Sequence, residues 1–178
     1  FLGWYYGQEH RAQIVIGKDT RRSSYMYECA LAAGITASGA DACLMHVTTT
    51  PSVSHIAKVD EFDCGIMISA SHNPYYDNGL KLINGHGEKM EPEVIDEIES
   101  YLDSDWEPPY ATGEDIGRVI DYASGRNRYI GYLISLATHS YKDMRVALDC
   151  ANGSAWMIGK SVFEALGAEV HVLGDAPN

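Results

Sequence analysis

Basic residues are scarce in this chain. Its 178 residues include 13 lysines and arginines against 25 aspartates and glutamates, a formal net charge of -12 at pH 7. A general nucleic-acid-binding surface needs clustered Lys and Arg to neutralise phosphates, so this balance argues against a nucleic-acid partner. The few basic residues that do cluster are more informative for that reason.

Long apolar runs are missing as well. No stretch approaches the roughly 18 apolar residues that a membrane span needs, so we expect no membrane partner. The first residues, FLGWYYGQEHR, have no basic start followed by an apolar stretch, and so they do not predict a signal peptide. They also begin without methionine, which is consistent with missing upstream sequence.

Cysteine motifs are absent too. The four cysteines lie far apart without a C-x-x-C spacing, each among apolar or small residues: Cys29, Cys43, Cys64 and Cys150. This pattern predicts buried, reduced thiols in a cytoplasmic protein. The histidines at 10, 46, 55, 86, 139 and 171 show no metal-ligand spacing such as H-E-x-x-H.

What the sequence does contain is an alternation of apolar runs and helix-forming stretches. Apolar runs predict strands over 13–17, 42–47, 64–70 and 79–84. Between and after them, helical patterns cover 25–40, a stretch starting with Thr50 as N-cap and Pro51 as first helical residue, and 91–102. Nearly continuous apolar strands between helices are typical of a mixed, mainly parallel sheet covered on both faces. We therefore predict a three-layer α/β/α domain over residues 1–102.

The pattern restarts after a polar stretch with two adjacent prolines. Residues 103–125 predict a linker. Residues 126–178 then contain an amphipathic helix and one β-α-β unit, which cannot cover its own sheet. We therefore predict the beginning of a second, similar α/β domain that is truncated.

Two polar loops follow predicted strands and carry the candidate chemistry. One is SASHNPYYDNGLK (69–81), and the other is GKDTRRSS (17–24), which opens a predicted helix. Open α/β sheets bind ligands at the carboxyl ends of their strands, where both loops should lie. A helix start attracts anions, and Arg21 or Arg22 would add a bidentate grip on phosphate. Together the loops predict a phosphate-handling serine site.

A serine hydrolase fits the first of these loops poorly. Ser71 and His72 are neighbours on an extended segment, so their side chains should point apart. A nucleophile elbow needs glycine two residues on either side of the serine, where Ser69 and Asn73 stand. Asn-Pro and Asp-Asn-Gly predict turns, which explain the shape of the loop but not its Ser, His and Lys. The segment DCANGSA (149–155) lacks a nucleotide-binding pattern and predicts a packing turn.

These motifs resemble those of the α-D-phosphohexomutase family. SASHNPYYDNGLKL resembles the phosphoserine loop, GKDTRRSS the G-[RK]-D-x-R-x-S segment, and TTTPSV the P-T-P stretch of that family. ALDCANGSA and LGAEVHVLGDAPN resemble the opening of its second domain. The resemblance covers essentially the whole chain in order, and within the family the serine loop and DCANG are most similar to the bacterial phosphoglucosamine mutase branch.

The resemblance implies a mutase that interconverts hexose 6- and 1-phosphates, here those of glucosamine, through a bisphosphate intermediate. It implies Ser71 as the phosphorylated carrier, His72 as the adjacent active-site histidine, and Lys81 as a residue that assists proton transfer or stabilises charge. Arg21 matches an arginine near the transferring phosphoryl group, and Arg21, Lys81 and Asn73 would bind phosphate. The resemblance also implies Mg²⁺, held by the phosphate on Ser71 and by aspartates absent from this chain, and a hexose 1,6-bisphosphate as activator. The small-molecule partner would be a sugar phosphate, and a homodimer is left open.

Several parts of the family pattern are not found. The F-G-T-x-G-x-R segment at the start of domain I, the metal-binding D-G-D-x-D-R loop and the recognition loops of domains three and four are absent. We therefore interpret the chain as an N-terminal fragment that is inactive alone. Ser24 and Arg22 stand where many members have glycine and an apolar residue. Phosphomannomutase or phosphoglucomutase of the same family, a non-catalytic sugar-phosphate-binding module and a phosphatase that uses Ser71 are the alternative interpretations.

Overall fold

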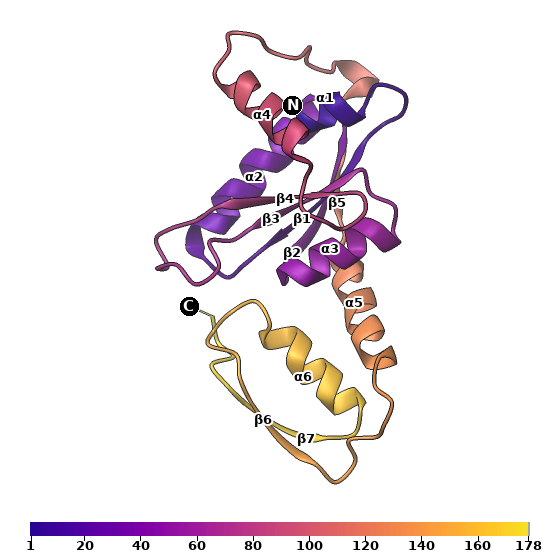
Figure 1. The fold of residues 1–178 in the computed structure, drawn as a ribbon, viewed down its shortest axis with the longest axis vertical. Helices are drawn as coiled ribbons and strands as arrows, with labels where there is room; N and C mark the ends of the chain where they lie inside the picture. The colour runs from indigo at the N-terminus through magenta and orange to yellow at the C-terminus, as the bar shows by residue number, and fades with distance from the viewer. Residues whose placement is uncertain (178) are drawn as a thin grey trace.

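Within residues 1–177, which the computed structural model describes, five strands form a larger sheet and two form a smaller one (Figure 1). Asn178, the last residue of the predicted second domain, lies outside the described residues. The strands of the larger sheet are β1 (Gln13–Lys18), β2 (Asp41–Val47), β3 (Cys64–Ile68), β4 (Leu80–Asn84) and β5 (Val119–Asp121). The helical elements around it are α1 (Leu2–Tyr6), α2 (Arg22–Ala37), α3 (Thr50–Val59), α4 (Pro92–Leu102) and the 3₁₀ turn η1 (Gly113–Asp115).

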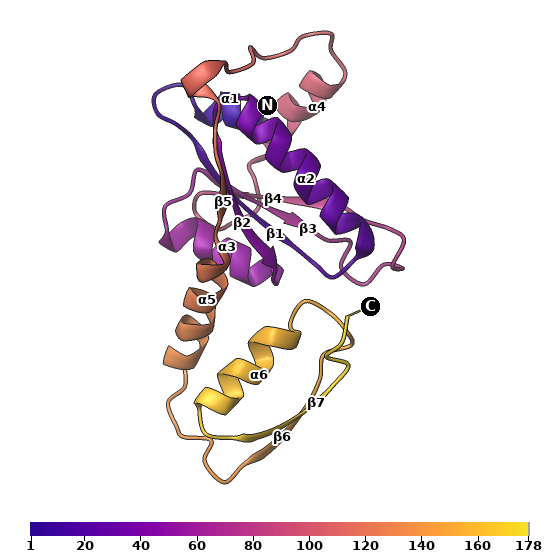
Figure 2. The same ribbon diagram turned by 180° about the vertical axis from the view of Figure 1, so that it is seen from behind.

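The larger sheet is mixed and mainly parallel, as predicted. Its strands lie in the order β4-β3-β1-β2-β5, and every neighbouring pair is parallel except the antiparallel pair of β3 and β4. Helices cover both faces: α2 lies on one side and α3 on the other (Figures 1 and 2). The three-layer α/β/α architecture is therefore confirmed.

The apolar runs are continuous because each inner strand is buried on both faces. On β1, Ile14 and Ile16 pack with Ile35 of α2, whereas Val15 between them packs with Val53 of α3. Successive side chains of a strand point to opposite faces, so a strand covered on both sides needs apolar residues at every position. This is why the runs predicted the strand positions closely.

The segment predicted as a linker contributes a strand to the larger sheet. Residues 119–121 form β5, which pairs in parallel with β2. The buried carboxylate of Asp41 accepts hydrogen bonds from the backbone N–H of Arg118 at 2.8 Å and from its Nη2 at 2.7 Å. The larger sheet therefore extends past residue 102. A run of three residues is too short to show a strand period, which is why the sequence did not predict β5.

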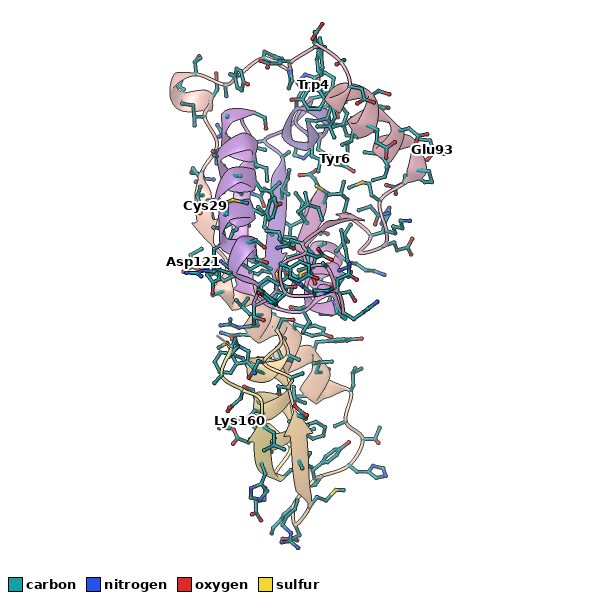
Figure 3. All side chains as sticks on the ribbon, turned by 90° about the vertical axis from the view of Figure 1, so that its left-hand side faces the viewer. Trp4, Tyr6, Cys29, Glu93, Asp121 and Lys160 are labelled. Carbon is teal, nitrogen blue, oxygen red and sulfur yellow. The ribbon has the colours of Figure 1, made fainter. Side chains whose placement is uncertain are left out.

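Several helix starts differ from the predictions: α2 begins at Arg22 and not at Tyr25, and a further helix, Ala123–Ser135, begins inside the predicted linker. The N-cap of α3 is Thr49 and not Thr50, and its side chain makes no capping hydrogen bond. Near the N-terminus, α1 was not predicted at all. It is stabilised by aromatic packing, in which Trp4, labelled in Figure 3, meets Trp106 edge to face at 4.9 Å between ring centroids.

The smaller sheet belongs to the second part of the chain. It consists of β6 (Arg145–Asp149) and β7 (Glu169–Leu173), which are parallel and are connected by α6 (Trp156–Ala165). Between the two sheets runs α5 (Ala123–Ser135), which packs against both α3 and α6 (Figure 1). None of the helices in the described part of the chain is long and apolar enough to cross a membrane.

Candidate active site at the carboxyl ends of β1 and β3

The two polar loops meet where the connections of the larger sheet diverge. β1 lies between β3 and β2, and α2 and α3, which follow β1 and β2, cover opposite faces of the sheet. In open α/β sheets, ligands bind in the crevice at the carboxyl ends of strands where the connections switch sides in this way. A cleft of ≈ 750 Å³ opens at this point. Its lining includes the five predicted site residues: Arg21, Ser71, His72, Asn73 and Lys81.

Ser71 stands on a strained turn at the edge of this cleft. Its φ is +58°, in the left-handed region that disfavours any residue with a Cβ. Its backbone N–H donates to Oγ of Ser69 at 3.0 Å. Backbone bonds from Asn73 N–H to the carbonyl of Ala70 and from Asp77 N–H to that of Pro74 close two turns, one on each side of the predicted Asn-Pro turn, whereas Asp77, Asn78 and Gly79 do not form the predicted turn. Backbone strain of this kind is concentrated at functional sites, because it persists only where surrounding contacts enforce it.

Lys81 and His72 approach the serine from different elements. Lys81 lies on β4, opposite Met67 of β3, so the antiparallel pairing returns it to the carboxyl end of β3. Its Nζ donates to the backbone carbonyl of Ser69 at 3.0 Å, which places an ammonium group beneath the serine loop. His72 is exposed and lines the cleft beside Ser71.

Arg21 contacts the backbone of the serine loop. Its Nη1 donates to the carbonyls of Pro74 and Asp77, and its Nη2 donates to the carbonyls of Ser71 at 2.9 Å and Asn73 at 3.0 Å. Only 9% of its side chain is exposed. The sequence predicted Arg21 to bind phosphate, whereas the structure directs its guanidinium to the loop itself.

Asp19 and the first residues of α2 hold the other end of the loop. Oδ1 of Asp19 accepts from the backbone N–H of Arg21 at 3.0 Å and from Oγ of the buried Ser24 at 2.8 Å, while Oδ2 accepts from Nε of Arg21 at 2.8 Å. The Asn78 amide nitrogen donates to Oγ of Ser23 at 2.9 Å and to Oγ of Ser24 at 3.0 Å. A glycine at position 24 would provide neither of the Ser24 contacts.

One wall of the cleft comes from a loop that was interpreted as a packing turn. Residues 151–154 line it, and the hydroxyl of Thr20 donates to the carbonyl of Asn152 at 3.0 Å. Ala151 and Asn152 have φ values of +47° and +52°. The Asn-Gly pair shortly after a predicted strand was the signal in the sequence for a loop at the end of that strand. It does not indicate which cleft the loop faces, because that depends on how the second part of the chain packs on the first.

The described residues do not make a complete magnesium site. Within residues 1–177 no group of three or more His, Cys, Asp or Glu side chains could hold a metal ion. The Asp19 carboxylate is engaged on both oxygens, and Oδ2 of Asp77 is within 3.4 Å of the Asn73 amide nitrogen. The sequence predicted only one metal ligand from this chain, a phosphate oxygen on Ser71, and the described residues supply no further set of ligands for it.

Known proteins with similar sequences include phosphoglucosamine mutases. The chain is 65% identical over 182 residues to the phosphoglucosamine mutase of Lachnospira eligens and 60% identical over 179 residues to that of Lachnoclostridium phytofermentans. Each alignment covers 100% of this chain and 40% of the relative. The chain thus spans about two fifths of the length of the curated relatives it matches.

Solved structures share the fold at lower sequence identity. A phosphoglucomutase/phosphomannomutase family protein from Burkholderia thailandensis superimposes with a TM-score of 0.79 at 22% identity, over 99% of this chain and 38% of that one. Parafusin, a phosphoglucomutase from Paramecium, gives a TM-score of 0.62 at 17% identity over 99% of this chain and 39% of that one. The family model described as phosphoglucomutase/phosphomannomutase, alpha/beta/alpha domain I, matches residues 2–108. The chain therefore belongs to the phosphoglucomutase/phosphomannomutase family, as its motifs predicted.

Proposed function

We propose that the protein carrying this chain is a phosphohexomutase that interconverts glucosamine 6-phosphate and glucosamine 1-phosphate. Family membership and the names of its most similar relatives support this activity. The observation that carries the proposal is the position of Ser71, which stands on a strained, clamped turn at the cleft with the Lys81 ammonium beneath the same loop.

In the proposed reaction Ser71 Oγ is the phosphoryl carrier. The P–O bond to Ser71 breaks as a P–O bond to the free hydroxyl of the sugar phosphate forms. That hydroxyl releases its proton and Ser71 Oγ takes one up, which gives a hexose bisphosphate and an unmodified serine. After the hexose bisphosphate reorients in the site, its other phosphoryl group is transferred back to Ser71. Ser71 thus gives up one phosphoryl group and regains another, and no water is consumed. Phosphoryl transfer depends mainly on positioning and charge neutralisation. We assign charge neutralisation to Lys81 and a role beside the transferring group to His72, while Asn73 would contribute to phosphate binding.

Mg²⁺ and a hexose 1,6-bisphosphate are the proposed cofactor and activator. The phosphate on Ser71 would offer one oxygen ligand, and the carboxylate ligands would come from outside this chain. When bound, the ion would neutralise charge on the transferring group. We also propose that the enzyme is cytoplasmic and that it can form a homodimer. The chain would be divided into domain I (1–102), a linker (103–125) whose β5 joins the larger sheet, and the start of domain II (126–178).

Turnover of the full-length protein tests the function directly. Glucosamine, glucose and mannose 1-phosphates are compared side by side, with Ser71→Ala as the control. We expect isomerisation, fastest on the glucosamine compound, and one added phosphate in the intact mass that the Ser71→Ala variant lacks. Preference for glucose or mannose would make it a different enzyme of the family. Net phosphate release would indicate a phosphatase, and neither turnover nor phosphorylation would indicate a sugar-phosphate-binding module.

The fragment interpretation has its own test. Since Ser71 would supply only one ligand of the metal, we expect the 178-residue chain with added Mg²⁺ to show no mutase turnover. Turnover by a chain of this length would contradict that interpretation.

A further inference from the structure

We propose that Arg21 is a positioning residue, which holds the serine loop in its reactive conformation and does not bind the phosphate of the substrate. This inference deepens the proposed function and rests on it. The sequence predicted that Arg21 binds phosphate, whereas the hydrogen bonds of its side chain point to the backbone of the serine loop.

The guanidinium of Arg21 has no N–H group left for a ligand. A guanidinium carries five N–H donors and no acceptor. Nε donates to Oδ2 of Asp19 at 2.8 Å. The other four donors are directed to the loop carbonyls described above, with Nη1 bonded to two of them and Nη2 to the other two. A bidentate grip on phosphate would have to break at least two of these bonds.

Breaking them would also remove the constraint on Ser71. The carbonyl of Ser71 is one of the four acceptors, and the other three belong to Asn73, Pro74 and Asp77, so the guanidinium spans the turn that follows the serine. A residue with a Cβ adopts a left-handed backbone only when surrounding contacts enforce it. Arg21 supplies such contacts from directly beside the serine. A loop released from Arg21 would sample other backbone conformations and move the Ser71 hydroxyl.

The second attachment of the loop comes from the same short segment. Asn78 is bonded to the hydroxyls of Ser23 and Ser24, and Ser24 is bonded in turn to Asp19, the partner of Arg21. Both ends of the loop are thus held by residues 19–24, the strand-to-helix turn that opens α2. The position of Ser71 relative to the cleft is set by this turn.

Arg21→Lys in the full-length protein tests the role. A lysine ammonium donates from one nitrogen and cannot span both sides of the loop, although it keeps the charge. We expect amide hydrogen exchange in the peptide 69–80 to speed up by about tenfold or more, because charged hydrogen bonds that close the loop are lost. Displacing a reacting group can lower a rate by on the order of 10²-fold, so kcat should fall by about that factor, while KM for the sugar phosphate stays within about threefold.

Arg22→Lys is the matched control. Arg22 is the next residue and is exposed, and among the hydrogen bonds of residues 1–177 its side chain donates none to the serine loop. The same change in side chain at this position should leave hydrogen exchange in the peptide 69–80 unchanged.

A raised KM for the sugar phosphate together with unchanged loop exchange in Arg21→Lys would overturn the proposal, because it would make Arg21 a phosphate ligand. If Arg21→Lys does not fold, Asp19→Asn removes the carboxylate charge that holds Nε of Arg21, the backbone N–H of Arg21 and Oγ of Ser24, but leaves the four bonds from Arg21 to the loop carbonyls, and should give a smaller but measurable increase in loop exchange. Unchanged exchange in that variant would also overturn the proposal. Should the wild-type protein lack turnover and phosphorylation, the mutase function fails, while the exchange comparison still decides whether Arg21 holds the loop.

Discussion

Removing the charge of Lys18 should destabilise the larger sheet strongly. Lys18 is the last residue of β1 and immediately precedes the segment that holds the serine loop. Only 2% of Lys18 and 6% of Glu28 are exposed, and the two side chains form an ion pair. Nζ of Lys18 also lies 3.6 Å from the centroid of the Tyr25 ring. In Lys18→Met, the Glu28 carboxylate remains buried without its partner.

The magnitude follows from the surroundings of that carboxylate. Oε1 of Glu28 has no hydrogen-bond partner among the described residues, and Nδ1 of the His46 ring lies 3.6 Å from it. Breaking a buried ion pair by removing one partner costs about 3–5 kcal/mol, whereas replacing both partners with apolar residues is often neutral. We therefore expect Lys18→Met to lower the free energy of unfolding by about 3–5 kcal/mol, and the double variant Lys18→Met/Glu28→Leu to recover at least about 2 kcal/mol of that loss.

Urea unfolding of this chain, followed by the fluorescence of its three tryptophans, measures these differences. Two of them, Trp4 of α1 and Trp106, pack on each other, and the third, Trp156, begins α6. If the free energy of unfolding of Lys18→Met were within about 1 kcal/mol of the wild-type value, the reasoning would be refuted, because a buried charge without a partner destabilises a protein by more than that. So would a double variant no more stable than the single one, because the loss would then come from packing and not from the charge on Glu28.

Three further predictions concern other parts of the chain. Since φ of Ser71 is +58°, Ser71→Gly should be more stable than Ser71→Ala by about 1 kcal/mol in thermal unfolding, and a more stable alanine variant would contradict the backbone strain. Burial of the Asp41 carboxyl acts to raise its pKa, but hydrogen bonds and charge from Arg118 outweigh this effect and hold the pKa below its ordinary value. This stabilisation should be present above about pH 4 and be lost as the pH falls through the lower folded-state pKa. Asp41→Asn should therefore be less stable at neutral pH, and its stability should depend less on pH on the acid side. An unchanged pH dependence of stability would exclude the ion pair of Asp41 as a cause of that dependence. Cys29 is exposed on α2 (Figure 3), whereas burial raises the pKa of Cys43 to about 11, so a thiol reagent should label Cys29 long before Cys43, and equal rates would contradict the packing.

The thiols show how far local sequence context reaches. Cys43 and Cys64 are buried, as predicted from their apolar strands, but the prediction for Cys29 was wrong and Cys150 is only half-buried. Cys29 lies on a helix, where neighbouring residues in the sequence face different directions. An apolar context along the chain therefore indicates burial in a strand covered on both faces, but does not tell which side of a helix faces the core.

The sequence by itself determined the α/β/α architecture, the strand positions and the family. Strands buried on both faces must be apolar throughout, and the chemistry of a phosphoserine loop needs a particular order of residues, so both leave local patterns. The sequence also determined that the loops after β1 and β3 would meet, because carboxyl ends of parallel strands share one edge of a sheet.

Only the tertiary structure decided what Arg21 contacts, that β5 joins the larger sheet and that residues 151–154 form a wall of the cleft. Each of these depends on partners 50 or more residues away, such as the 50 residues between Arg21 and Ser71 and the 132 between Thr20 and Asn152. An arginine beside a strand end has the same local pattern whether its five N–H groups meet a phosphate or the backbone of a neighbouring loop. The distinction lies in the positions of distant carbonyl oxygens, which local sequence does not encode.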